Sequence, residues 1–267
     1  MVQVQDSVLG KKTFYKDRYD PSLLFPIVRS DKRKEIGIGT KLPFHGEDVW
    51  FGYELSWLNA KGKPAITLAV FTFPCESSHL IESKSFKLYL NSFNQTRFES
   101  SDDVLQTLIE DLSKACGMGV GVQFIDRLPQ NDFKGISLDL LDIEADTYQV
   151  DPSLLKCGGD HVQESIHTNL FKSNCLVTGQ PDWASLFIHY QGPHIDHECL
   201  LRYIVSYRQH LEFHEQCIER IFIDLMRECC CEKLTVFGKF TRRGGLDINP
   251  FRSNFEQSLP HFQTARQ

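Results

Sequence analysis

The segment Val49–Trp57 reads VWFGYELSW, and apolar and polar residues alternate along much of it. Such alternation is typical of a β-strand with one buried face. A turn is expected at residues 59–64 (NAKGKP), and the apolar run at residues 65–73 (AITLAVFTF) predicts a second, largely buried strand. The three segments together predict a strand–turn–strand unit, around which the remaining elements can be placed.

Further elements follow from the same periodicities. A helix is expected from Ser101 to about Ala115, because apolar residues recur there at helical spacing, and residues 120–128 predict a strand. A second block begins near residue 161. Its expected elements are strands at 183–190 and 234–241, a helix at 212–227, a segment at 200–207 that fits either strand or helix, a turn at 191–196 and a loop at 242–250.

The two halves share an order of elements. In each, two strands lead to a short segment with a carboxylate, followed by a helix and a strand, and Glu82 and Glu215 hold comparable places. This order indicates a diverged internal duplication. Residues 1 to about 45 predict an irregular N-terminal arm, and the acidic, turn-rich stretch 132–160 predicts a connector.

Bulk composition restricts the classes of function. The chain has 267 residues, of which 41% are hydrophobic and 24% charged, and its net charge is −6. The absence of a basic stripe argues against a nucleic-acid binder, and no apolar stretch approaches the roughly 18 residues of a membrane span. No signal peptide is recognised, so we expect a cytoplasmic protein whose nine cysteines are thiols.

One of these cysteines, Cys175, lies in a polar, turn-rich stretch that also holds Asp182. A thiol reacts as its thiolate, and a neighbouring carboxylate raises the pKa of a thiol. Asp182 therefore suits a proton donor better than an activating base. From these residues alone the plainer interpretation, a packed cysteine beside a turn aspartate, is favoured.

Two other segments have the chemistry of ligand binding. The carboxylate of Glu82 could accept paired N–H groups, and Lys84 or Lys87 could meet a phosphate. Arg242 and Arg243 precede two glycines, a pattern that lets backbone and guanidinium groups approach an anion. A solvated helix face and a solvated turn are the plainer alternatives.

A zinc site is the remaining possibility that the residues raise. His210 and His214 have i, i+4 spacing and could share one face of a helix. No third ligand follows at a convincing spacing, and the HExxH motif is absent. The sequence therefore does not favour a metal site here, and we expect no metal.

Taken together, four segments resemble the QueF family, the NADPH-dependent 7-cyano-7-deazaguanine reductases. These segments are ESKSFKLY at 82–89, SNC at 173–175 with PDW at 181–183, EFHEQC at 212–217 and RRGGLDINP at 242–250. The resemblance implies an α+β fold of two tandem tunnelling-fold (T-fold) modules, with antiparallel sheets and helices on one face. The modules would span 1–130, with the ESKSFKLY signature, and 161–267, with the catalytic cysteine, joined by a connector at 131–160.

The resemblance also implies roles for individual residues. Cys175 would attack the nitrile carbon to form a covalent thioimidate, with Asp182 as the proton donor. NADPH would be used twice per turnover, to give 7-aminomethyl-7-deazaguanine for tRNA queuosine biosynthesis. The substrate-binding residues would be Ile81, Glu82, Ser83, His214 and Glu215, and the NADPH-binding residues would be Ser83, Lys84, Arg243 and Gly244.

The family further implies a homodimer with no direct nucleic-acid or membrane partner. Two other classes of function remain open at this point. One is a zinc-dependent hydrolase similar to GTP cyclohydrolase, and the other is a purine or pterin binding module without catalysis. The absent zinc-ligand pattern argues against the hydrolase, and the binding module would need no nucleophile at Cys175.

Overall fold

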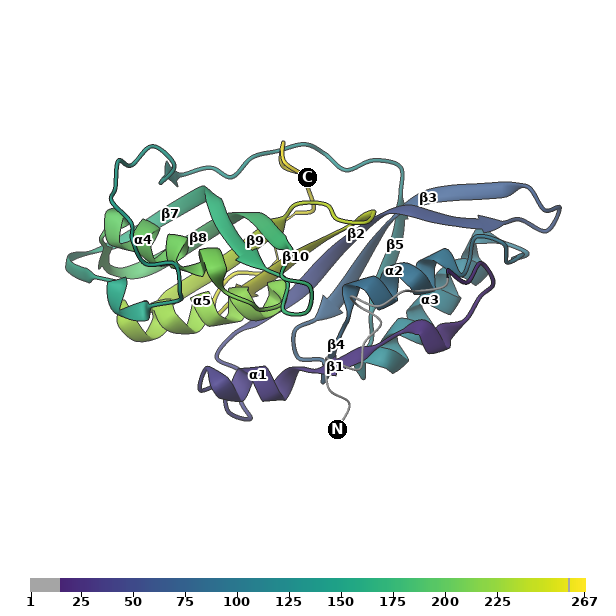
Figure 1. Cartoon of the computed structure of the whole chain (residues 1–267), viewed down its shortest axis with the longest axis horizontal. Helices are drawn as coiled ribbons and strands as arrows, with labels where there is room; N and C mark the ends of the chain where they lie inside the picture. The colour runs from purple at the N-terminus through teal and green to yellow at the C-terminus, as the bar shows by residue number, and fades with distance from the viewer. Residues whose placement is uncertain (1–14, 259) are drawn as a thin grey trace. The chain divides into compact units, whose positions relative to one another are not determined.

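A computed structural model describes residues 15–258 and 260–267 (Figure 1). The first fourteen residues of the expected N-terminal arm lie outside this range. The chain forms two compact units, neither of which is continuous in sequence. Unit 1 comprises the described part of Met1–Asp31, Asp48–Leu128 and Arg242–Ile248, and unit 2 comprises Lys32–Glu47, Pro129–Thr241 and Asn249–Gln267. The contiguous modules expected at 1–130 and 161–267 stay a prediction.

Unit 1 has helices on one face of a small sheet. Strand β3 (Pro64–Pro74) lies between β2 (His45–Leu58, of which 48–58 belong to unit 1) and the antiparallel β5 (Gly121–Ile125). Helices α2 (Ser83–Asn91) and α3 (Ser101–Cys116) lie along this sheet (Figure 1). Their apolar side chains share one core with strand residues such as Trp50 and Phe71. The remaining elements are the 3₁₀ turn η2 (Pro21–Leu23) and the paired strands β1 (Pro26–Val28) and β4 (His79–Ile81).

Unit 2 is built on a long antiparallel hairpin of β7 (Cys157–Asn174) and β8 (Pro181–Ile195). Strand β9 (Lys233–Phe240) pairs with β8, and β10 (Leu246–Ser253, of which 249–253 belong to unit 2) pairs with β9. Helices α4 (His197–Ser206) and α5 (His214–Glu228) lie along these strands in Figure 1. Shorter elements complete the unit: most of α1 (Arg29–Glu35), β6 (Ile136–Ser137), η3 (Pro152–Leu154) and η4 (Tyr207–Gln209).

The structure confirms the mixed α+β class with mainly antiparallel sheets, and it resolves residues 200–207 mostly as helix. Two segments expected to be turn or loop are strands. The turn expected at 191–196 is wrong because β8 continues to Ile195. Pro193 is tolerated there because β9 pairs with β8 only as far as Gln191, so no N–H donor is required on that side.

The loop expected at 242–250 is also wrong, since β10 starts at Leu246. A tight turn precedes it, in which Arg243 N–H donates to the Leu246 carbonyl at 2.8 Å. The polar residues that suggested a loop are buried and have specific partners. Tyr53 donates to Asp247 at 2.6 Å, and the amide of Gln267 donates to Asn249 at 2.6 Å.

The two units repeat the same local contacts, which supports the predicted duplication. The pentapeptide DPSLL occurs at 20–24 and again at 151–155, and each copy forms a 3₁₀ turn capped by its aspartate. This repeat is visible in the sequence. Each aspartate N–H also donates to a serine hydroxyl at the C-terminal end of a helix, from Asp20 to Ser92 at 3.2 Å and from Asp151 to Ser206 at 3.3 Å.

The repeat corrects one expectation. Helices α2 and α4 correspond, because the hydroxyls of Tyr89 and Tyr203 each donate at 2.7 Å to an aspartate of the following helix, Asp111 or Asp224. Each of the two helices has a carboxylate N-cap, Glu82 in α2 and Asp196 in α4. Glu215 lies instead in the first turn of α5. Glu82 and Glu215 therefore do not hold comparable places.

No helix in the described ranges is long and apolar enough to cross a membrane.

Candidate active site

Cys175 is the first residue after β7, in the short connection to β8. Its N–H donates to the Gln180 carbonyl at 2.8 Å, and its own carbonyl accepts from Gly179 at 3.0 Å. Gly179 has a φ of 67°, a left-handed conformation that favours glycine. The turn thereby holds Cys175 at the end of the β7–β8 hairpin. Its thiol is free, and the residue is 7% exposed.

Asp182 lies at the same end of this hairpin. It is the second residue of β8 and pairs in register with Ser173 of β7. The Asp182 side chain is buried and lies 3.3 Å from Nε2 of His214. The sequence placed Asp182 in a turn-rich stretch with Cys175, whereas the structure has it in a strand whose pairing brings this carboxylate to the end that carries Cys175.

His214 is the first residue of α5. Its ring stacks on Phe240 with centroids 3.9 Å apart and planes at 19°. With Nε2 facing Asp182, the opposite nitrogen Nδ1 is buried and has no hydrogen-bond partner among the described residues. A buried polar atom without a partner is unfavourable, so Nδ1 is suited to meet a ligand.

The start of α5 is held against the end of β7. The N–H of Asn174 donates to the His210 carbonyl at 2.8 Å, and the N–H of Glu212 donates back to Asn174 at 3.2 Å. Burial acts to raise the pKa of Glu212, but hydrogen bonds from His210 and Arg220 outweigh it and lower the pKa to about 2. Glu212 therefore stays ionised and fixes the segment that presents His214 and the buried Glu215.

Glu82 is fully buried in unit 1 and caps α2. Its two carboxylate oxygens accept from the N–H groups of Lys84 and Ser85, each at 2.8 Å. Burial raises the pKa of Glu82, and these hydrogen bonds act against that rise. Each carboxylate oxygen has a second acceptor direction. The neighbouring Ile81 is buried, and Ser83 and Lys84 are half-buried.

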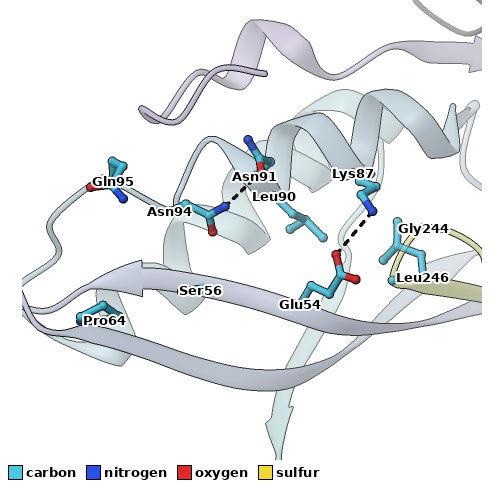
Figure 2. A pocket seen from close by; sticks show the side chains of 11 residues that line it. Glu54, Ser56, Pro64, Lys87, Leu90, Asn91, Asn94, Gln95, Gly244 and Leu246 are labelled. Carbon is cyan, nitrogen blue, oxygen red and sulfur yellow. Dashed lines mark hydrogen bonds and ion pairs between the residues drawn. The ribbon is translucent and has the colours of Figure 1, made fainter. Parts of the chain in front are cut away.

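A cavity of about 440 Å³ in unit 1 lies beside Gly244 and Gly245, here called the glycine pair (Figure 2). Lys87 from α2 faces Glu54 from β2 across it, with Nζ and Oε2 3.4 Å apart. Gly244 and Gly245 have φ values of 62° and 79°. A Cβ atom at Gly244 would lie 3.1 Å from the Lys87 side chain, and one at Gly245 would lie 2.4 Å from the Glu54 carboxylate. The left-handed backbone at both positions favours glycine in this wall of the cavity.

Polar side chains line the other end of this cavity. Asn91, Asn94 and Gln95 extend from α2 and the turn after it, and the Asn94 amide donates to Asn91 at 3.0 Å (Figure 2). The sequence interpretation missed these residues, together with Glu54 and Ser56. Glu54 and Ser56 are two positions apart, and such residues lie on the same face of a strand, so the alternation in 49–57 could have indicated them.

The predicted site residues thus fall into two groups. Unit 1 contains Ile81, Glu82, Ser83, Lys84, Arg243 and Gly244, and unit 2 contains Cys175, Asp182, His214 and Glu215. Arg243 is exposed, and the adjacent Arg242 stacks its guanidinium on Tyr53, 3.5 Å from the ring centroid. His210 pairs with Glu212 at 2.9 Å.

Comparison with known proteins gives consistent matches. Residues 15–124 match the family described as "Nitrile reductase, 7-cyano-7-deazaguanine-reductase N-term", and residues 181–258 match "QueF-like protein". The chain is 54% identical over 271 aligned residues to an NADPH-dependent 7-cyano-7-deazaguanine reductase of Burkholderia multivorans, covering 98% of this chain and 99% of that one. A relative of the same name from Hydrogenovibrio crunogenus is 56% identical, with 98% and 96% covered.

Among solved structures, the apo form of the archaeosine synthase QueF-Like is similar at a TM-score of 0.32 and 14% identity. This match covers 38% of the present chain and 99% of the other. A likeness of this size supports no conclusion about fold or function.

Proposed function

The chain belongs to the QueF family of nitrile reductases, and from this premise we propose that it is an NADPH-dependent 7-cyano-7-deazaguanine reductase. The reaction converts the nitrile to a primary amine by adding two hydrides and two protons, which requires two NADPH per turnover. Its product, 7-aminomethyl-7-deazaguanine, enters tRNA queuosine biosynthesis. The proposal rests on relatives 54% and 56% identical that cover nearly the whole chain.

In this proposal Cys175 is the nucleophile. Its S–H bond breaks as the sulfur bonds to the nitrile carbon. The nitrile nitrogen takes a proton from Asp182, and Asp182 regains the proton that the thiol releases, which gives a thioimidate with no net change in protons. Loss of the carbon–sulfur bond after reduction at that carbon returns the thiol. The arrangement of the β7–β8 hairpin supports this assignment, because Cys175 and Asp182 are both buried at one end of it. Burial excludes water, which would otherwise hydrolyse the adduct.

We propose that the deazaguanine base is held by Ile81, Glu82, Ser83, His214 and Glu215. A carboxylate can accept side by side from the ring N–H and the amino group of such a base. The observation that supports this part most directly is His214, whose buried Nδ1 has no partner in the described chain while its Nε2 faces Asp182. A ligand atom at Nδ1 would satisfy it and would fix the ring that orients Asp182.

NADPH would supply the hydrides when bound, and the residues that we propose to hold it are Ser83, Lys84, Arg243 and Gly244. The chain fits a cofactor with phosphate groups, because the cavity wall at Gly244 and Gly245 must be free of side chains and faces the ammonium group of Lys87. A glycine backbone and a cation are the groups that phosphates approach closely. Glu54 partly offsets this charge through its pair with Lys87.

We further propose that the protein is a cytoplasmic homodimer of chains with two T-fold modules each, at 1–130 and 161–267. The repeated contacts Asp20–Ser92 and Asp151–Ser206 support two related modules. The net charge of −6 supports action on the free base rather than on tRNA.

Intact-mass spectrometry of the protein mixed with 7-cyano-7-deazaguanine, without NADPH, tests the proposal. We expect a covalent adduct with the full mass of the substrate, and its absence from Cys175→Ala. With NADPH present, absorbance should fall by two equivalents per substrate, and chelators should not change the rate. Base binding without adduct or NADPH loss would identify a binding module, and full turnover by Cys175→Ala would refute the assigned nucleophile.

A further inference from the structure

A second cluster of chemically active side chains lies in unit 2, outside the groups described above. It comprises Glu164 of β7, His194 of β8 and His197, the first residue of α4. One ligand atom from each side chain lies within 4.8 Å of the others, and all three residues are half-buried. Two imidazoles and a carboxylate are a donor set that zinc and similar divalent transition metals bind.

The distances within the cluster are those of a site that needs little movement to close. Nε2 of His197 lies 3.1 Å from Oε2 of Glu164, and the rings of His194 and His197 have centroids 5.2 Å apart. Ligands about 2.0–2.2 Å from a tetrahedral metal lie about 3.4 Å from one another. The pair Glu164–His197 already has nearly this spacing, and the ligand atom of His194 lies within 4.8 Å of both.

A buried tyrosine orients the carboxylate. The Tyr190 hydroxyl donates to Oε2 of Glu164 at 2.8 Å and accepts from the N–H of Ile195 at 3.0 Å. His197 Nε2 lies 3.1 Å from the same carboxylate oxygen, so this oxygen is held by two side chains. Such outer hydrogen bonds are typical of metal sites.

We propose that Glu164, His194 and His197 bind one divalent transition metal of the zinc type, with water as a further ligand. The site has a structural role because it lies far from Cys175. Glu164 pairs with Tyr190, whereas Cys175 follows Asn174 at the other end of the β7–β8 hairpin. Ten residues of extended strand span about 30 Å. The metal would link β7, β8 and the start of α4, and the nitrile chemistry does not depend on it.

Titration of the metal-free protein with Co²⁺, followed by visible absorption, tests this inference. We expect one equivalent with d–d bands of nitrogen and oxygen ligation and without a thiolate-to-cobalt charge-transfer band, which separates this site from the nine cysteines. His194→Ala and Glu164→Gln should weaken binding at least tenfold, and Tyr190→Phe should weaken it roughly 10- to 100-fold.

His161→Ala is the matched control, because His161 lies on the same hairpin but its side chain is 61% exposed and pairs with Glu232. It should bind Co²⁺ as the native protein does, and every variant should keep its rate of NADPH oxidation. Unchanged binding by His194→Ala, or binding only with a thiolate band, would overturn the proposal. If His194→Ala does not fold, His194→Gln and the melting temperature of the native protein with and without Zn²⁺ decide: no rise in melting temperature rejects the site.

Discussion

Substitution of Glu82 by glutamine separates two roles that this carboxylate combines. Both of its oxygens accept backbone N–H groups at 2.8 Å in the cap of α2, and we propose that it also binds the substrate base. A glutamine side chain offers one acceptor oxygen, so its NH₂ group would face the N–H of Lys84 or Ser85. Because this position is buried, losing one such bond should cost about 1–2 kcal/mol of unfolding free energy.

The internal repeat provides a matched control. Asp196 caps α4 as Glu82 caps α2, and it accepts from the N–H of Cys199 at 2.8 Å. Asp196→Asn keeps a capping oxygen and should cost only about 0.3–1 kcal/mol through the lost charge at the helix N-terminus, and it should leave the KM for the nitrile unchanged. Glu82→Gln should in addition raise this KM at least tenfold, since one of two parallel hydrogen bonds to the base is lost. Stability is measured by urea unfolding and the KM by NADPH oxidation.

The pH dependence of stability gives a second readout for the same variant. Burial raises the pKa of Glu82 in the folded protein, so the folded state holds this proton more tightly than the unfolded state. Its contribution to stability is present below the unfolded pKa and is lost as the pH rises through the folded pKa. Glu82→Gln should lack this loss. A Glu82→Gln protein with native KM for the nitrile would refute the base-binding role and leave Glu82 as a helix cap.

Three other predictions concern unit 2 and the glycine pair. Glu219→Gln should lower the unfolding free energy, measured by urea unfolding, by about 3–5 kcal/mol. The reason is that the Glu219 carboxylate lies between the buried guanidinium groups of Arg33 and Arg252, at 2.6 and 2.8 Å. As the control, Glu198→Gln at an exposed position should change it by at most about 1 kcal/mol. The pKa of Glu212 is lowered to about 2, so its carboxylate should stabilise the folded protein at pH values above the unfolded pKa of 4.5, and this stability should be lost as the pH falls through 2. In Glu212→Gln, the unfolding free energy measured in urea should therefore depend less on pH in this acid range. Gly245→Ala should raise the KM for NADPH, measured by initial rates, because its Cβ would lie 2.4 Å from the Glu54 carboxylate; an unchanged value would remove the cavity from the cofactor site.

Local patterns predicted those elements in which buried and exposed residues recur with the period of a strand or a helix. The alternation in 49–57 predicted β2, and helical spacing predicted α3 and α5. Strand β7 could not be found in this way, because most of its first half is exposed and polar and is held by its pairing with β8. Strand β10 is buried throughout, yet it contains Asp247 and Asn249, whose partners come from distant parts of the chain.

The candidate site shows the same division. Cys175 and Asp182 are close in sequence, and a short hairpin connection is sufficient to bring them to one end of a strand pair. The contact of Asp182 with His214 depends on the parallel bridge between Asn174 and Leu211, which no local pattern indicates. The cavity beside Gly244 likewise needs a helix, a strand and a turn that are far apart in the sequence.

The repeated units also indicate how one scaffold came to hold different chemistry. In each hairpin, the N–H of the residue after the first strand donates to the carbonyl just before a proline, from Asn59 to Lys63 at 2.9 Å and from Cys175 to Gln180 at 2.8 Å. The Asn59 side chain is used within its own turn, where it accepts from Lys61 and Lys63 at 3.0 Å. Unit 1 thus has an amide where unit 2 has a thiol. An amide forms no covalent adduct of this kind, so under the proposed function unit 1 would contribute through groups such as the Glu82 carboxylate, which is one methylene longer than its counterpart Asp196.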